Sequence, residues 1–440
     1  MRAVKVRGTQ SQFSAELCFP GDKSLSHRAI ISGSLAEGVS SFTNVLWGGD
    51  CVCTRRAFES LGVEIQSKSL TELSISGRGL RSLKAPREDI YLGNSGTSMR
   101  LLLGILAGNK FEATVTGDPS LSSRPMRRVT DYLRQMGASF EGKDNANFAP
   151  IRVRGGDLHG IDARLSVPSA QVKSALLLAG LYAKGVTRVT EPVKSRDHTE
   201  RFLKFFGADL KEEGLSVSIA GGQALKARSL AIPGDISSAA FFMALPLLVS
   251  GAVLRYRSVL WNPTRTGIVD VMKKMGAEVL MEKLNEEGPE PSADFSVRGA
   301  GLHAFEVKRE ELPPLIDEIP ILMVLATQAR GTTVIREASE LRVKESDRIH
   351  SMTAGLLKMG AKVRVEDDTL FIEGPTPLKG AVIDSFKDHR TAMAFIMAGM
   401  AARGETVVKD VDCIDTSFPN FFELLGSLGA AYQMVDTLSH

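Results

Sequence analysis

The strongest constraint on the fold is a sequence pattern that recurs six times, about once every 70 residues. Each copy has an apolar helix-like run, a glycine, a β-like stretch, and an amphipathic helix that ends at a second glycine. The first glycines are Gly38, Gly108, Gly185, Gly251, Gly331 and Gly404. The second are Gly62, Gly137, Gly207, Gly276, Gly360 and Gly429. Solenoid repeats are the alternative, but their periods reach only about 50 residues, so each copy predicts a small α/β layer.

The number of repeats predicts the domain organisation. A chain of 440 residues is longer than one hydrophobic core usually supports, so two domains of three repeats each are expected. Each repeat predicts a strand, a helix, a strand, a helix and two more strands. Because the strands have one polar face, we expect the sheets on the outside and the helices on the inside. The predicted class is therefore α/β, with two domains that each contain three βαβαββ units. The predicted domains are residues 21–234, and residues 1–20 together with 235–440.

Composition excludes several classes of function. The formal net charge of +3 is near neutral and no long run of one sign occurs, so neither a nucleic acid nor a membrane is expected as a partner. The N-terminus has no signal-peptide pattern, and the longest apolar stretch is shorter than a bilayer span and contains Pro246. We therefore expect a cytoplasmic protein. The spacing of the four cysteines and seven histidines fits no metal site, so no metal is expected.

Polar clusters stand directly before the predicted helices. For any single cluster, capping is the simpler explanation, because Ser, Thr, Asp and Asn are the usual N-cap residues. A cation in the first helical turn opposes the helix dipole, however, unless an anion neutralises it. Such cations recur at Lys23, Arg28, Arg100 and Lys173. Their recurrence in several repeats predicts a site for phosphate and carboxylate groups.

Two acidic residues stand among these cations. Asp317 precedes an apolar helical run, and Glu345 lies between Lys344 and Arg348. Each carboxylate fits a structural ion pair, and each also fits a proton-transfer role inside a cationic site. The residues alone leave both interpretations open.

A series of short motifs spans nearly the whole chain. They are GDKS (21–24), GNSGTSMR (93–100), SSRPMRR (122–128), SAQVK (169–173), RDHTE (196–200), NPTR (262–265), LIDE (315–318), LRVKESDR (341–348), DHR (388–390) and TSFP (416–419). In order and spacing, the motifs resemble those of the 5-enolpyruvylshikimate-3-phosphate synthase family, in the subclass that includes glyphosate-tolerant members. The resemblance implies an enolpyruvyltransferase-like fold of two domains with three βαβαββ units each. It also implies transfer of the enolpyruvyl group of phosphoenolpyruvate to the 5-hydroxyl of shikimate 3-phosphate, with release of phosphate.

The resemblance further implies which residues form the site, in a cleft between the two domains. The residues that would bind shikimate 3-phosphate are Lys23, Ser24, Arg28, Ser169, Ala170, Gln171, Arg196, Asp317 and Lys344. Those that would bind phosphoenolpyruvate are Lys23, Asn94, Gly96, Arg124, Gln171, Arg348 and Arg390. The catalytic residues would be Lys23, Asp317 and Glu345. These two small molecules are the expected partners of a monomer that needs no cofactor.

Two residues depart from the patterns of the family. Tolerant members carry Ala at the position of Gly96, so we expect glyphosate to inhibit this chain. Thr416 stands where the other subclass has a phosphate-binding Lys, so that contact is absent or supplied elsewhere. Both expectations rest on the resemblance.

Three other functions were weighed against this one. The enolpyruvyltransferase that acts on UDP-N-acetylglucosamine typically has Asn after the first-loop Lys and a Cys in the second repeat, whereas this chain has Ser24 and no Cys between residues 54 and 412. RNA 3′-phosphate cyclases are built from related units, but the near-neutral charge disfavours them. An inactive anion-binding scaffold would be expected to lack Asp317 or Glu345, and both are present.

Overall fold

The computed structural model describes residues 2–8, 14–249, 251–299 and 301–436. The chain divides into two compact units. The first unit is Gly21–Ile232 together with Glu287–Glu290. The second unit is Met1–Pro20, Pro233–Glu286 and Pro291–His440. The segment Glu287–Glu290, expected from the sequence to belong with the second domain, packs with the first unit, where the buried His198 ring contacts Glu290 (2.7 Å between Nδ1 and Oε1).

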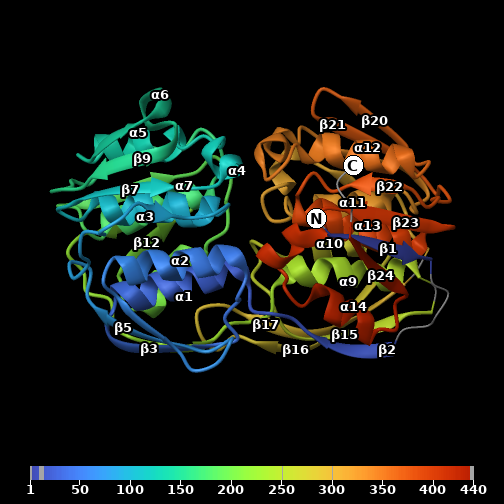
Figure 1. The fold of residues 1–440 in the computed structure, drawn as a ribbon, viewed down its shortest axis with the longest axis horizontal. Helices are drawn as coiled ribbons and strands as arrows, with labels where there is room; N and C mark the ends of the chain where they lie inside the picture. Colours follow the sequence, from blue (N-terminus) through green and yellow to red (C-terminus); the bar gives the residue numbers. More distant parts are fainter. Residues whose placement is uncertain (1, 9–13, 250, 300, 437–440) are drawn as a thin grey trace. The chain divides into compact units, whose positions relative to one another are not determined.

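The first unit contains three four-stranded sheets with the orders β14-β3-β5-β4, β6-β7-β9-β8 and β10-β11-β13-β12 (Figure 1). Its strands are β3 (Glu37–Thr43), β4 (Glu64–Ser67), β5 (Leu73–Arg78), β6 (Ile90–Tyr91), β7 (Glu112–Thr116), β8 (Ser139–Gly142), β9 (Phe148–Arg154), β10 (Asp162–Arg164), β11 (Val186–Thr190), β12 (Leu210–Glu213), β13 (Ser216–Ala220) and β14 (Ser229–Ala231). Its helices are α1 (Lys23–Leu35), α2 (Gly49–Ser60), α3 (Gly96–Ala107), α4 (Pro119–Ser122), α5 (Arg127–Gln135), α6 (Lys143–Ala146), α7 (Ala170–Gly180) and α8 (His198–Phe205).

The second unit repeats this architecture with the sheet orders β16-β17-β15-β2, β18-β19-β21-β20 and β22-β23-β1-β24. Its strands are β1 (Arg2–Arg7), β2 (Ser14–Cys18), β15 (Val253–Leu260), β16 (Glu278–Asn285), β17 (Ser292–Arg298), β18 (Glu306–Val307), β19 (Gly331–Ile335), β20 (Lys362–Glu366), β21 (Thr369–Gly374), β22 (Val382–Asp384), β23 (Glu405–Lys409) and β24 (Tyr432–Asp436). Its α-helices are α9 (Ile236–Leu248), α10 (Gly267–Lys274), α11 (Ile319–Ala326), α12 (Arg348–Lys358), α13 (His389–Ala401) and α14 (Phe421–Ser427). Its 3₁₀ helices are η1 (Arg309–Glu311), η2 (Ser339–Val343) and η3 (Val411–Thr416).

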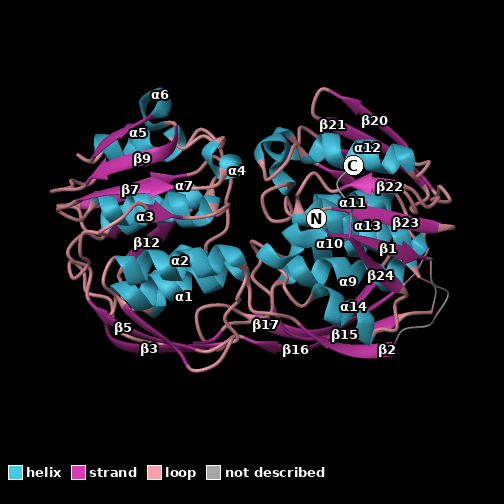
Figure 2. Cartoon of the chain, viewed as in Figure 1, coloured by secondary structure: helices cyan, strands magenta, loops and turns pink. Residues whose placement is uncertain are grey.

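Every sheet pairs its strands in the same way. In the second repeat, β6 is parallel to β7, and β9 is antiparallel to both β7 and β8. The burial of β9 alternates along the strand, so one face of the sheet packs inward and the other faces solvent. Figure 2 shows the strands of each unit lying around its helices. The predicted fold class, α/β with three βαβαββ units per domain and the sheets outside, is confirmed.

Two strands do not join the repeat that follows them in the sequence. β2 directly precedes α1 in the chain, but it pairs in parallel with β15 of the second unit. β14 directly precedes α9, but it pairs in parallel with β3 of the first unit. The sheet of the sixth repeat is completed by the N-terminal β1, which is antiparallel to both β23 and β24. Each unit is therefore closed by a strand that is distant in sequence.

The core of each unit consists of the apolar helices at the centre of the repeats. Helices α3 and α7 are buried along nearly their whole length. A Cβ atom at Gly104 of α3 would lie 2.2 Å from the carbonyl oxygen of Ala175 in α7, so the two backbones are in direct contact. In the second unit a Cβ at Gly355 of α12 would lie 2.1 Å from the ring of Phe395 in α13. A side chain at either position would therefore push the two helices apart.

The repeated glycines have two different roles. Gly62 directly follows Leu61, the C-cap of α2. Its φ of +87° is the left-handed backbone conformation that commonly ends an α-helix and that glycine adopts without strain. Gly38 does not cap α1: the cap is Ala36, and Gly38 lies within β3 with a φ of +108°. Gly108 caps α3 with an ordinary right-handed φ of −86°. Within the described part of the chain, no helix has the length and apolar character needed to cross a membrane.

Candidate active site

The N-terminus of α1 holds the first group of candidate residues. The buried Asp22 is the N-cap and accepts a hydrogen bond from the backbone N–H of Leu25 at 2.9 Å. Lys23 begins the helix, and its Nζ lies 3.2 Å from Oδ2 of Asp50 in α2. Ser24 follows and is half-buried. The ammonium group of Lys23 is thus held by a partly exposed carboxylate at the start of the helix.

Arg28 lies one turn further along α1 and is buried. Its guanidinium donates to the hydroxyl of Thr199 at 2.8 Å, to the hydroxyl of Ser174 at 2.9 Å and to the carbonyl oxygen of Ser24 at 3.0 Å. All three acceptors are uncharged, and burial lowers the pKa of Arg28 to about 10. These bonds fix the direction of the guanidinium. Its charge is compensated only by carboxylates that it does not contact directly, such as Glu200.

The N-terminus of α3 forms the second group. Arg124 is buried and donates to Oδ1 of Asn94 at 2.5 Å and to the carbonyl oxygen of Asn94 at 3.4 Å. A Cβ atom at Gly96 would lie 3.0 Å from Nη1 of Arg100 and 3.3 Å from Nη1 of Arg124. Two guanidinium groups therefore lie beside the first turn of α3, where the helix dipole favours an anion.

The N-terminus of α7 forms the third group, and it contacts the second. Ser169 caps α7 by accepting from the N–H of Val172 at 3.4 Å, and Ala170 is the first residue of the helix. The side chain of Gln171 donates to Thr97 at 2.9 Å and accepts from Arg100 at 2.5 Å. Arg196 lies half-buried in the segment between β11 and α8. The structure thus brings Gln171 to the start of α3, beside Asn94 and Gly96, with which the resemblance groups it.

Lys173 has a different environment from the one expected. Its ammonium group is buried and lies 2.7 Å from Glu191 and 2.7 Å from Glu200. The two carboxylates raise the pKa of Lys173 although burial opposes the charge, and burial raises the pKa of Glu200. The expectation that Lys173 faces an anionic ligand is wrong, because protein carboxylates neutralise it inside the fold.

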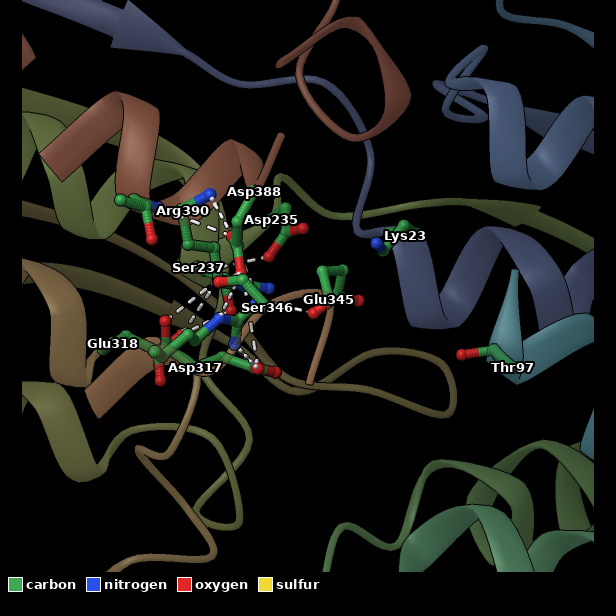
Figure 3. A network of polar contacts seen from close by, with 12 residues as sticks. Lys23, Thr97, Asp235, Ser237, Asp317, Glu318, Glu345, Ser346, Asp388 and Arg390 are labelled. Carbon is green, nitrogen blue, oxygen red and sulfur yellow. Dashed lines mark hydrogen bonds and ion pairs between the residues drawn. The ribbon is translucent and has the colours of Figure 1, made fainter. Parts of the chain in front are cut away.

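The second unit holds the remaining candidates around the buried guanidinium of Arg348 at the start of α12. Figure 3 shows Asp317, Glu345, Asp388 and Arg390 of this group. Arg348 contacts Asp388 at 2.9 Å, Glu345 at 2.6 Å and Asp317 at 3.2 Å. Burial opposes the charge on Arg348, but Asp388, Glu345 and Asp317 together raise its pKa above the usual value. One guanidinium therefore holds both of the carboxylates that the sequence singled out.

Arg390 lies at the start of α13, beside Asp317. Its Nη1 donates to the carbonyl oxygen of Asp317 at 3.2 Å, and its Nε lies 3.6 Å from Oδ1 of the same residue. Asp388 caps α13 and accepts from the N–H of Arg390 at 2.9 Å and from the hydroxyl of Ser346 at 3.0 Å. Burial alone would raise the pKa of Asp388, but Arg348 lowers it below the usual range. Asp388 thus orients the guanidinium of Arg348 and caps the helix that carries Arg390.

A further buried network supports the cluster and was not predicted. Arg265, from the NPTR motif, donates to the hydroxyl of Ser237 at 2.9 Å and contacts Asp235 at 3.2 Å. Ser237 in turn donates to Glu318, whose Oε1 lies 4.0 Å from Arg390. Asp235 and Ser237 precede and begin α9, so their role could have been inferred only as helix capping. The network links the starts of α9, α11 and α13.

Two further residues from the motifs of the second unit lie at the ends of its 3₁₀ helices. Lys344 is half-buried and directly follows η2. The hydroxyl of Thr416 donates to the carbonyl oxygen of Cys413 at 2.7 Å, within its own turn. Among the residues that the structure describes, no group of three or more His, Cys, Asp or Glu side chains could hold a metal ion.

Comparison with known proteins identifies the class and then the family. The fold is that of the enolpyruvyl transferases: the crystal structure of the enolpyruvyl transferase NikO from Streptomyces tendae covers 99% of this chain and 99% of that chain, with a TM-score of 0.79 at 17% identity. The structure of EPSP synthase from Acinetobacter baumannii is more similar, with a TM-score of 0.89 and 42% identity over 99% of this chain and 100% of that one. The family model for EPSP synthase (3-phosphoshikimate 1-carboxyvinyltransferase) matches residues 8–425.

Curated relatives agree with the structural neighbours. The 3-phosphoshikimate 1-carboxyvinyltransferase of Brevibacillus brevis is 49% identical over 416 residues, which cover 94% of this chain and 97% of the relative. The enzyme of the same name from Bacillus licheniformis is 48% identical over 96% of this chain and 99% of the relative. The chain belongs to the EPSP synthase family. It is therefore a transferase of the shikimate pathway to aromatic amino acids, which moves the enolpyruvyl group of phosphoenolpyruvate to shikimate 3-phosphate, and the predicted function is confirmed.

Proposed function

We propose that the residues at the helix N-termini of both units bind the two substrates together and carry the proton transfers of this reaction. The single observation that best supports the proposal is the arrangement around Arg348, where one buried guanidinium contacts Asp317 at 3.2 Å and Glu345 at 2.6 Å. Carboxylates at a cationic site are suited to proton transfer when they are oriented by fixed partners. Arg348 and Asp388 supply that orientation here.

In this proposal the first unit binds shikimate 3-phosphate. Arg28 and Ser24 hold the carboxylate, because the guanidinium is oriented by three neutral acceptors and can add an ionic partner. Ser169, the backbone N–H of Ala170 and the guanidinium of Arg196 hold the phosphate, since the start of a helix favours an anion. Gln171, which Arg100 and Thr97 orient, contacts the ring.

Phosphoenolpyruvate is bound in two parts. Lys23, Asn94, Gly96 and Arg124 hold its phosphate, at the start of α3 and beside the start of α1. Arg348 and Arg390 hold its carboxylate, and bidentate guanidinium contacts suit that group. The phosphate and carboxylate of this substrate are therefore assigned to different units of the chain.

The chemistry consists of an addition and an elimination. Asp317 accepts the proton of the 5-hydroxyl as the oxygen bonds to C2 of phosphoenolpyruvate, and Glu345 gives a proton to C3, which becomes a methyl group in the tetrahedral intermediate. The C2–O bond to phosphate then breaks, C3 returns a proton to Glu345, and the proton held by Asp317 leaves with the phosphate, which gives the vinyl ether and hydrogen phosphate. Lys344 donates to a substrate hydroxyl, and Lys23 donates to the leaving phosphate.

Charge balance supports joint binding of the substrates. Two phosphates and two carboxylates bring a charge of about −6 in total. Lys23 and Arg348 already pair with Asp50 and Asp388, and the proposed contacts include seven cations in all. They are Lys23, Arg28, Arg124, Arg196, Lys344, Arg348 and Arg390. Orienting two anions that repel each other in water supplies much of the rate enhancement expected of such a site.

Phosphate release tests this function directly. The protein is mixed with phosphoenolpyruvate and shikimate 3-phosphate, and inorganic phosphate is measured over time. We expect release that requires both substrates and that stops when unphosphorylated shikimate replaces shikimate 3-phosphate. A correctly folded sample that releases no phosphate with both substrates would contradict the proposal.

A further inference from the structure

Lys173 is the centre of a buried charged cluster in the first unit that the proposed chemistry does not use. Its Nζ lies 2.7 Å from Oε2 of Glu191 and 2.7 Å from Oε1 of Glu200, and the three side chains are only 2%, 2% and 1% exposed. Three charges removed from water are costly to bury, so such a cluster requires an explanation beyond ordinary packing. The explanation offered by the structure is what each member of the cluster touches next.

Glu191 organises the segment that carries Arg196. It directly follows β11, and it accepts hydrogen bonds from the backbone N–H of Ser195 at 3.3 Å and from the hydroxyl of Ser195. Ser195 is buried and adjoins Arg196 in the chain. The carboxylate thus closes the turn from residue 191 to 195 and fixes where Arg196 leaves the fold.

Glu200 and Lys173 have neighbours that orient Arg28. Thr199, which precedes Glu200 in α8, accepts from Nε of Arg28 at 2.8 Å. Ser174, which follows Lys173 in α7, accepts from Nη2 of Arg28 at 2.9 Å, and the two hydroxyls lie 2.6 Å apart. Lys173 and Ser174 are thus consecutive in α7, and Thr199 and Glu200 are consecutive in α8. One residue of each pair forms the ion pair, and the other accepts a hydrogen bond from Arg28.

We infer that Lys173 is a positioning residue that holds three groups in one arrangement: the start of α7, the segment carrying Arg196, and Arg28. In the proposed function, on which this inference rests, these groups bind the phosphate and the carboxylate of shikimate 3-phosphate. Lys173 touches neither substrate. It sets the distance between the two anion subsites and so determines affinity for one substrate.

The charges also give Lys173 a role in keeping Arg28 available. Glu200 is near enough to raise the pKa of Arg28, although burial lowers that pKa overall. With Lys173 present, Glu200 has a direct cationic partner at 2.7 Å. Without Lys173, Arg28 is the cation left to compensate Glu200, so Glu200 would compete with the substrate carboxylate for Arg28.

The effect should be confined to one substrate. The residues proposed for the phosphate of phosphoenolpyruvate have partners elsewhere: Lys23 pairs with Asp50 at 3.2 Å, and Arg124 donates to Asn94 at 2.5 Å. Neither pair involves the Lys173 cluster. A change at Lys173 should therefore alter the KM for shikimate 3-phosphate more than the KM for phosphoenolpyruvate.

The test compares Lys173→Met with the double variant Lys173→Met/Glu200→Gln. Losing well-oriented contacts to one charged group corresponds to roughly tenfold to hundredfold in affinity. We expect Lys173→Met to raise the KM and the Kd for shikimate 3-phosphate by that amount, while the KM for phosphoenolpyruvate and kcat stay within about threefold. The double variant removes the competing carboxylate, so it should recover most of the affinity.

Leu177→Ala is the matched control. Leu177 is buried in the same helix and has no charged or hydrogen-bonding group, so this variant loses stability without removing a polar partner from the charged cluster. We expect its KM values to stay near those of the unchanged protein. If Leu177→Ala raises the KM for shikimate 3-phosphate as much as Lys173→Met does, or if the double variant recovers nothing, the inference is overturned.

Lys173→Arg keeps the test decisive if Lys173→Met does not fold. The larger guanidinium keeps the charge but displaces the two carboxylates, so the KM for shikimate 3-phosphate should again rise selectively, and an unchanged KM would overturn the inference. Failure of the proposed function gives a different result, because the unchanged protein would then release no phosphate with both substrates. Normal release together with unselective variants would reject only the role of Lys173.

Discussion

At the scale of single residues, the site depends on a few buried guanidinium groups with fixed partners. Arg348 contacts carboxylates from three parts of the sequence, Asp317, Glu345 and Asp388. The pairing of Arg348 with Glu345 could be anticipated from the sequence, because the two residues are only three apart in one motif. The contact with Asp388 spans 40 residues and could not be predicted from the sequence, since only the fold brings α12 and α13 together.

Local composition also gave one wrong expectation at this scale. Lys173 was grouped with Lys23 and Arg28 because all three are cations at the start of a helix. The partners that distinguish Lys173, Glu191 and Glu200, are 18 and 27 residues away in the sequence. A charge pattern alone therefore does not separate a ligand-binding cation from a buried structural one.

Gly96→Ala tests the space beside the proposed phosphoenolpyruvate site. The added methyl group would meet the ends of two flexible side chains, Arg100 at 3.0 Å and Arg124 at 3.3 Å, so the protein should fold normally. Shifting Arg124 should cost about 1 kcal/mol of phosphoenolpyruvate binding, a roughly fivefold rise in its KM. Glyphosate inhibition, measured from the rate of phosphate release, should weaken by at least as much.

The unchanged protein is the reference for this prediction. Because residue 96 is Gly, glyphosate should inhibit it measurably. An unchanged rate in millimolar glyphosate would contradict the assignment of Gly96 to this subsite.

At the scale of elements, the starts of the helices combine capping with function. Ser169 caps α7 and is also a proposed phosphate ligand, so the two interpretations that compete in the sequence are compatible in the structure. Helices α1, α2 and α3 are joined by a buried chain of polar side chains: His27 contacts Thr54 at 2.7 Å, Thr54 contacts Ser98 at 2.6 Å, and Ser98 contacts Ser95 at 2.6 Å. The chain links the helix of Lys23 to the start of α3. The apolar periodicity predicted these helices, but it carried no information on this link.

His27 makes the stability of the first unit depend on pH. Burial, reinforced by the positive charges of Lys23 and Arg28, lowers the pKa of His27 to about 3. Between pH 3 and the ordinary value of 6.5 the unfolded chain binds a proton that the folded chain does not. The free energy of unfolding should therefore fall by about 1.4 kcal/mol per pH unit below pH 6.5 on account of this one group, and the contribution should be constant above that pH.

His27→Asn should remove this part of the pH dependence. The free energy of unfolding is measured with urea at several pH values between 4.5 and 7.5, for the unchanged protein, for His27→Asn and for His159→Asn. His159 is exposed, so its variant serves as the control and should keep the full slope. Equal slopes for all three proteins would show that His27 is not held neutral.

At the scale of the whole molecule, pairing between distant strands closes each unit. The repeats predicted how many sheets there are and which helices follow them, because each repeat is local in sequence. They did not predict that β2 would pair with β15, that β14 would pair with β3, or that β1 would complete the sixth sheet. Periodicity within a segment does not specify a distant partner. The N-terminal residues are therefore structural parts of the second unit.

Val4→Asp tests this role of β1. Val4 is fully buried and pairs with Val408 of β23 and Met434 of β24. An unpaired buried carboxylate should lower the free energy of unfolding of the second unit by more than about 3 kcal/mol. Lys5→Gln, a change at a partly exposed position of the same strand, should cost little. Hydrogen exchange measured at increasing urea concentration distinguishes the unfolding of the two units. Equal losses of unfolding free energy from the two variants would contradict the assignment.

The central claim is that residues of the two units have separate roles in one reaction. It is tested most directly by the steady-state rate of phosphate release, measured while the concentrations of both substrates are varied. Arg28→Ala should raise the KM for shikimate 3-phosphate by roughly tenfold to hundredfold with a smaller effect on kcat. Glu345→Gln should lower kcat by roughly a hundredfold or more with little effect on that KM, because it removes a proton-transfer group. Similar changes in KM and kcat from both variants would contradict the account.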